Sequence, residues 1–182
     1  MVAIRPEDRL TLQLRPFGVP VRVHPSFFMI VAALGANLRP RPLSALVWIS
    51  TVLVVLLLGE LAHAAAFRAL GYAPRIVLHW AGAETFVARA TPRAPSQLIA
   101  AYLAAPVTVL ALAGIARLLA VIVQAPALDD LFHLATFWGV ASLLPIVPLS
   151  GGYAWQVALV RVAGQHARTV ARVTSLLYGS AG

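Results

Sequence analysis

Three long apolar runs constrain this chain more than any other feature of its sequence. They cover residues 43–67, 96–123 and 131–149. A helix needs about 20 mostly apolar residues to cross a hydrocarbon core about 30 Å thick, and these runs approach or exceed that length. We count the shorter run 26–38 as a further span, although its length also suits a re-entrant or buried helix. The sequence therefore predicts an all-α, multi-pass membrane protein with about four transmembrane helices in a single domain, residues 1–182.

The composition supports a membrane environment and excludes several other classes of protein. Hydrophobic residues make up 60% of the 182 positions and charged residues 11%, and the mean hydropathy is +0.86. Such a chain is too apolar to be disordered, and its 14 arginines are too dispersed to form a nucleic-acid-binding patch. We therefore expect a lipid bilayer, and no nucleic acid, as its partner. Because cysteine is absent, any metal must bind through His, Asp or Glu.

The arginines also predict the orientation of the spans. With a cytoplasmic N-terminus, four spans place 11 of the 14 arginines on the cytoplasmic side and only Arg39 and Arg41 on the outer side. Cytoplasmic loops of membrane proteins carry an excess of positive residues, so we predict that both termini are cytoplasmic. Arg117 lies within the third span near its outer end, where we expect it either to extend its side chain to the interface or to pair with Asp129 or Asp130.

Two segments outside the spans have patterns of their own. Residues 75–90 hold two β-favouring runs around a glycine turn, which predicts a small β-hairpin that lies at the cytoplasmic interface or packs against the helices. A free edge of that hairpin would accept a partner strand. Residues 153–178 carry Arg161, Arg168 and Arg172 on one helical face, which predicts a C-terminal interfacial helix rather than a fifth span.

Two motifs in the spans are candidates for chemistry. Glu60 and His63 are three residues apart in the second span and therefore share a helical face. Ionisable residues within a span are costly to bury and usually functional. The fourth run ends in residues that cannot continue a regular helix, and broken helices at membrane depth usually line a cavity. We therefore expect one cavity to contain Glu60 and His63 together with residues of this broken segment: Ser142, Pro145, Pro148, Gly151 and Gly152.

These motifs resemble those of the site-2 protease family of intramembrane zinc metallopeptidases. That family carries His-Glu-x-x-His on one helix and Asn-x-x-Pro-x-x-Pro-Leu-Asp-Gly on a later one. Residues 59–63, Gly-Glu-Leu-Ala-His, are similar to the first motif, and residues 142–151 are similar to the second. Residues 17–27 resemble the lead-in to the family's first helix, and residues 103–107 its Ala-Gly-Pro helix. The resemblance covers about residues 15–175 and implies the family's fold, zinc cofactor and transmembrane protein substrates.

The resemblance also implies a role for each matching residue. In the family both histidines and the aspartate hold zinc, and the glutamate activates the metal-bound water. His63 is then the retained ligand and Glu60 the retained general base. Gly59 replaces the first histidine, Ser150 replaces the aspartate, and Ser142 replaces the asparagine. One imidazole cannot hold zinc alone, and a neutral hydroxyl is a poor substitute for a carboxylate.

The leading hypothesis is therefore a pseudoprotease that binds transmembrane or extended peptide segments and contains little or no zinc. An intact paralogue is a further partner that this hypothesis allows. One alternative is an active metallopeptidase whose zinc ligands are displaced to other positions. Glu60 itself could become a ligand. The further candidate ligands are His24, His79, Glu84 and His133, and His79 fits best among them. A small transporter or channel subunit is the other alternative, although the outer halves of the spans offer almost no polar path.

Overall fold

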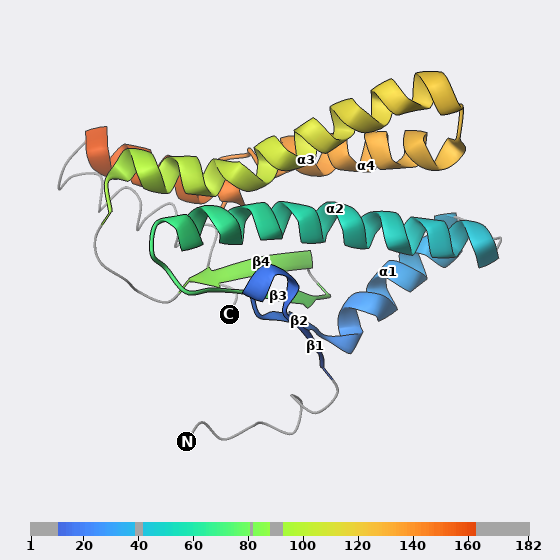
Figure 1. Cartoon of the computed structure of the whole chain (residues 1–182), viewed down its shortest axis with the longest axis horizontal. Coiled ribbons are helices and arrows are strands. Elements are labelled where there is room, and N and C mark those ends of the chain that lie inside the picture. The colour runs from blue at the N-terminus through green and yellow to red at the C-terminus, as the bar shows by residue number, and fades with distance from the viewer. Residues whose placement is uncertain (1–10, 39–41, 81, 88–92, 163–182) are drawn as a thin grey trace.

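The computed structural model describes residues 11–38, 42–80, 82–87 and 93–162 (Figure 1). Its main helices are α1 (Pro25–Leu38), α2 (Pro42–Ala69), α3 (Pro95–Val123) and α4 (Pro126–Ala141), and each begins at a proline. Proline is favoured in the first helical turn because its missing N–H would have no partner there. A further helix runs from Ser150 to residue 162, the last described position.

Two of these helices, Leu43–Ala69 and Pro95–Val123, are long and apolar enough to cross a membrane by length and composition, and each contains an 18-residue stretch with a mean hydropathy of 2.3. The other two expected spans correspond to α1, with 14 residues, and α4, with 16. Both are shorter than the usual length of a bilayer-crossing helix. A set of four spans therefore stays a prediction.

The fourth apolar run differs from its predicted helix at both ends. Instead of covering residues 131–149, the helix begins at Pro126 and ends at Ala141, and residues 142–149 form turns. The prolines within these turns lack the N–H that a continuing helix needs. The next helix starts at Ser150 rather than at residue 153. Residues 163–178 of the predicted interfacial helix, including Arg168 and Arg172, lie outside the described residues.

Two adjacent glycines allow this turn segment to fold back onto the start of the next helix. The N–H of Gly151 donates to the carbonyl of Ser142 over 2.8 Å. A Cβ atom on Gly151 would overlap the carbonyl group of Leu143, and one on Gly152 would overlap that of Ile146. The segment therefore requires residues without side chains at both positions.

The predicted hairpin is present, but it belongs to a larger sheet. β3 (Pro74–His79) and β4 (Gly82–Val87) pair antiparallel with Ile76 opposite Thr85, while residues 88–90 of the predicted hairpin lie outside the described residues. Two further strands, β1 (Leu12–Leu14) and β2 (Val21–Val23), flank a short 3-10 turn, Pro16–Gly18. β2 pairs parallel with β3, so the sheet has the order β1-β2-β3-β4. The all-α prediction is thus corrected to a mainly helical fold with a small mixed sheet.

Helix α2 is the central element of the molecule. Figure 1 shows the sheet on one side of α2 and the α3–α4 pair on the other. Ile76 and Leu78 of β3 are completely buried on the sheet side, together with Phe27 and Ala64. On the other side Val55 of α2 packs with a cluster from α3 and α4: Val109, Ala113 and Ala135. One face of α2 therefore contacts strands while the other contacts helices.

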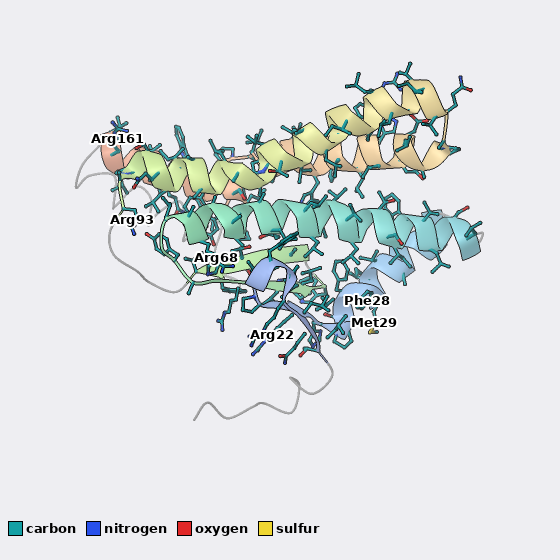
Figure 2. All side chains as sticks on the ribbon, in the orientation of Figure 1. Arg22, Phe28, Met29, Arg68, Arg93 and Arg161 are labelled. Atoms are coloured by element: carbon teal, nitrogen blue, oxygen red, sulfur yellow. The ribbon has the colours of Figure 1, made fainter. Side chains whose placement is uncertain are left out.

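Charged residues lie at both ends of this layered structure. Figure 2 shows Arg68, Arg93 and Arg161 toward the end where α2 finishes and α3 begins. At the opposite end, the Nη1 atom of Arg117 lies 3.7 Å from Oδ1 of Asp129, which confirms the expected pairing. Both of these side chains are more than half exposed, so the pair contributes little to stability.

Candidate functional site

Glu60 and His63 lie on one face of α2, on the side that meets β4. The Nδ1 atom of His63 lies 3.7 Å from Oε2 of Glu60, and their side chains are 8% and 15% exposed. The hydroxyl of Thr85, in β4, donates to the same Glu60 oxygen over 2.5 Å. A residue of the sheet therefore fixes the position of the Glu60 carboxylate.

These side chains line a cavity of about 310 Å³. The structure brings Glu60 and His63 together there with Pro148 and Ser150 of the broken segment. The remaining walls come from β4 and from two tyrosines: Ala83, Glu84, Thr85, Phe86, Val87, Tyr102 and Tyr153. Residues more than 80 positions apart in the sequence thus meet at one site.

The other residues of the broken segment lie elsewhere. The hydroxyl of Ser142 donates to the carbonyl of Gly139 over 3.0 Å, which caps the end of α4. Pro145 and Gly151 line a separate cavity of about 250 Å³. Gly152 is buried against the backbone of Ile146. These residues shape the turn and do not line the cavity that contains Glu60.

The candidate substitute ligands are also dispersed. His24 bonds to Ser26 through Nδ1 over 2.7 Å, and His133 lines a different, apolar cavity between α2 and α4. His79 lies on β3 with Nε2 3.9 Å from Oε2 of Glu84. Of this group, Glu84 lines the cavity with Glu60 and His63.

Gly59, one helical turn before His63, faces α3. A Cβ atom on this residue would lie 2.9 Å from Cγ2 of Val109 and 3.9 Å from Cβ of Ala105. Contacts below 3 Å require the neighbour to move, and the branched side chain of valine has few alternative rotamers. The absence of a side chain at residue 59 therefore allows α2 and α3 to pack closely.

An aromatic cluster surrounds the imidazole of His63. The ring centroids of Phe67 and Tyr102 lie 5.0 Å and 5.6 Å from that of His63. Tyr102 in turn stacks on Tyr153 at 5.3 Å with an interplanar angle of 20°. Sequence reasoning missed both tyrosines, although Tyr153 follows Ser150 by about one helical turn and so shares its face.

The electrostatic environment of the cavity is acidic. Burial raises the pKa of Tyr153, and the negative charge of Glu84 raises it further. The phenol of Tyr153 therefore keeps its proton at neutral pH and is available as a hydrogen-bond donor. Two carboxyl side chains, Glu60 and Glu84, line this cavity in a chain whose formal net charge is +8.

The arrangement of helices, sheet and broken segment matches a known fold. No protein-family model matches the chain, and no curated protein matches it by sequence. By structure, the chain is similar to the site-2 protease from Methanocaldococcus jannaschii, with a TM-score of 0.68 and 19% sequence identity. The match covers 92% of this chain and 81% of the other. The chain has the site-2 protease fold.

Within this site-2 protease fold, the described cavity-lining residues with side chains able to bind zinc include Glu60, His63 and Glu84. Zinc sites in proteins use three or four ligands from Cys, His, Asp or Glu. Among the described residues, no three His, Asp or Glu side chains lie close enough together to hold a metal. Position 59 carries no side chain and faces Val109, and position 150 offers only a hydroxyl. His63 is buried, yet neither of its ring nitrogens has a hydrogen-bond partner in the described structure.

Proposed function

We propose that this chain is a membrane-embedded, site-2-protease-like protein that binds a transmembrane or extended polypeptide segment without hydrolysing it. The contact between Gly59 and Val109 is the observation that carries this proposal. In this proposal residue 59 takes the position of the family's first zinc-binding histidine, and that position serves helix packing instead.

The remaining catalytic residues support the same conclusion. Zinc-dependent hydrolysis needs a metal with an open coordination position and a general base beside it. This chain offers His63 and Glu60, and the Glu60 carboxylate accepts a hydrogen bond from Thr85. Ser150 supplies a neutral oxygen where the family motif has a carboxylate.

The capacity to bind a segment rests on β4. This strand stands at one edge of the sheet, and residues 83–87 of it line the cavity. A peptide that adds to an exposed sheet edge forms main-chain hydrogen bonds, and its side chains enter neighbouring pockets. An extended segment beside β4 would therefore place a side chain next to Glu60 and His63.

The membrane setting follows from α2, α3 and the arginines. Two apolar helices of sufficient length and the arginine-rich end of the molecule support a multi-pass protein whose N- and C-termini are cytoplasmic. The cavity would then open toward the cytoplasmic interface. Its partners would be the bilayer and a transmembrane client.

A co-purification in lipid nanodiscs tests this function. The chain is mixed with a single-span protein whose helix is interrupted by Gly-Pro, and with the same protein carrying an uninterrupted polyleucine span. Native mass spectrometry should detect a complex with the interrupted client, and the client should keep its intact mass. If neither client forms a complex with the chain, the proposal is contradicted.

One observation favours a second candidate, an active metallopeptidase with a displaced ligand. Glu84 lines the same cavity as Glu60 and His63, and His79 lies within 3.9 Å of Glu84. A new donor set would require the Glu84 carboxylate to reach the side chains of Glu60 and His63. This candidate predicts that chelator-sensitive cleavage products of the client appear after zinc is added, and that Glu84→Gln abolishes them.

A further inference from the structure

The cavity around Glu60 has a chemical character that identifies what enters it. We propose that it binds the cationic side chain of a lysine or arginine in the captured segment. This inference rests on the proposed function, because the cation arrives as part of a polypeptide beside β4. It adds the chemical class of the residue that the cavity selects.

The distribution of charge is the first observation that supports this inference. The chain has six acidic residues, and two of them, Glu60 and Glu84, line this one cavity. No arginine is among the described residues that line it. The Glu60 side chain is 15% exposed and that of Glu84 37%, so the Glu84 carboxylate is the more accessible of the two.

The state of His63 is an independent observation. Only 6% of this residue is exposed, and neither ring nitrogen has a hydrogen-bond partner in the described part of the chain. Buried polar atoms in proteins almost always have partners. The 3.7 Å between His63 Nδ1 and Glu60 Oε2 is too long for a good hydrogen bond between them. Because His63 does not occupy the Glu60 carboxylate, that carboxylate can accept further hydrogen bonds from a donor that enters the cavity.

The aromatic wall fits the same class of ligand. Cations are attracted to the faces of tyrosine and phenylalanine rings. Tyr102 and Tyr153 form a stacked pair in the wall of the cavity. Phe86, a cavity-lining residue of β4, already has a contact of this kind. The guanidinium carbon of Arg75, in β3, lies 5.4 Å from the centroid of its ring. An aliphatic side chain of lysine or arginine would contact these rings while its charged end reaches Glu60.

The spacing of the donors favours an organic cation over a metal ion. A divalent metal requires several ligands at short, fixed distances from one point. The described His, Asp and Glu residues do not form such a group. An ammonium or guanidinium group instead carries its own N–H donors, and these bond to acceptors spread over a larger volume.

Two matched peptides test the inference on the full chain in nanodiscs of zwitterionic phosphatidylcholine, which does not attract cations by itself. One is a fluorescein-labelled, β-favouring heptapeptide with a single central lysine, and the other carries norleucine in place of lysine. Fluorescence anisotropy measures both dissociation constants. We expect the lysine peptide to bind about tenfold more tightly or better, because a charge-assisted hydrogen bond contributes at least that factor. An arginine peptide should show the same preference over norleucine.

Charge-removing variants locate the effect. Glu60→Gln and Glu84→Gln should each abolish most of the preference for lysine, measured as the ratio of the dissociation constants of the two peptides. Asp129→Asn is the matched control, because it removes the same charge from an exposed carboxylate at the other end of the molecule. It should leave both affinities unchanged.

The outcomes separate this inference from the proposed function. Equal affinities for the lysine and norleucine peptides in the unmodified chain would overturn the cation inference and leave segment capture intact. Failure of all three peptides to bind would overturn segment capture itself. The comparison of peptides uses the unmodified chain, so it does not depend on the folding of any variant.

Discussion

Gly59 of α2 and Val109 of α3 form a close contact in which a Cβ atom on the glycine would lie 2.9 Å from Cγ2 of the valine. This contact changes how the glycine is understood. The resemblance to the family motif implies only that Gly59 stands where a zinc ligand is expected. The structure adds that a side chain at this position would meet Val109 of α3.

Replacing Gly59 with alanine tests that requirement. Alanine is favoured over glycine in a helix by about 1 kcal/mol, whereas inserting a methyl group into a packed contact costs about 1–3 kcal/mol. We therefore expect Gly59→Ala to lower the free energy of unfolding by about 1 kcal/mol, measured by thermal unfolding in detergent. Adding Val109→Ala to Gly59→Ala should relieve the contact. An unchanged or higher stability of Gly59→Ala alone would show that α2 and α3 tolerate a side chain at residue 59.

Restoration of a zinc site should require three substitutions. The motif comparison by itself suggests that Gly59→His with Ser150→Asp is sufficient. Because Val109 fills the space beside residue 59, we expect the double variant to bind zinc poorly and the triple variant with Val109→Ala to bind about one zinc per chain. Elemental analysis of the purified variants measures this. A folded triple variant without zinc would argue against the alignment of residues 59 and 150 with the family's ligands.

Thr85 should stabilise the buried Glu60 carboxylate through its hydroxyl. Thr85→Val keeps the shape of the side chain but removes the donor, and an unpaired buried acceptor costs about 1–3 kcal/mol. We expect a corresponding loss of unfolding free energy for Thr85→Val and little loss for Thr85→Ser. The penalty of Thr85→Val should shrink in a Glu60→Gln background, since no charge is then buried. The same penalty in both backgrounds would mean that the hydrogen bond does not support the carboxylate.

Gly151 and Gly152 should tolerate no side chain. An added Cβ on either would overlap a backbone carbonyl of the preceding turn, and a backbone cannot move aside as a side chain can. We expect each alanine variant to lower the unfolding free energy by about 3 kcal/mol or more. Gly114→Ala in α3 is the control, because no atom lies within 4 Å of its added Cβ. If all three variants unfold at the same temperature, the turn is not packed as described.

Several features of the fold were accessible from sequence for clear physical reasons. Hydropathy identifies α2 and α3, because a helix that crosses lipid must be apolar over its length. The β-favouring runs identify β3 and β4, and the prolines identify a break before residue 150. The helical spacing of Glu60 and His63 places both on one face, and the structure brings them together with Pro148 and Ser150.

Other features of the fold left no recognisable pattern in the sequence. β1 and β2 are three residues each, too short for an alternating pattern. β2 pairs with the edge of β3, and β1 pairs in turn with β2. The apolar character of residues 142–149 predicted that the fourth span continues through them. That prediction was wrong because turns can be as apolar as helices. The contact of Gly59 with Val109 and the stacking of Tyr102 on Tyr153 arise between segments far apart in the sequence. Such contacts depend on tertiary packing, which no local pattern encodes.

Zinc content is the most direct test of the central claim that this site no longer holds a catalytic metal. The native chain is purified in detergent without chelator or added zinc, and its metal is measured by elemental analysis against protein concentration. We predict far less than one zinc per chain, and the same low value for His63→Ala. One zinc per native chain that is lost in His63→Ala would contradict the account and favour a metallopeptidase with displaced ligands.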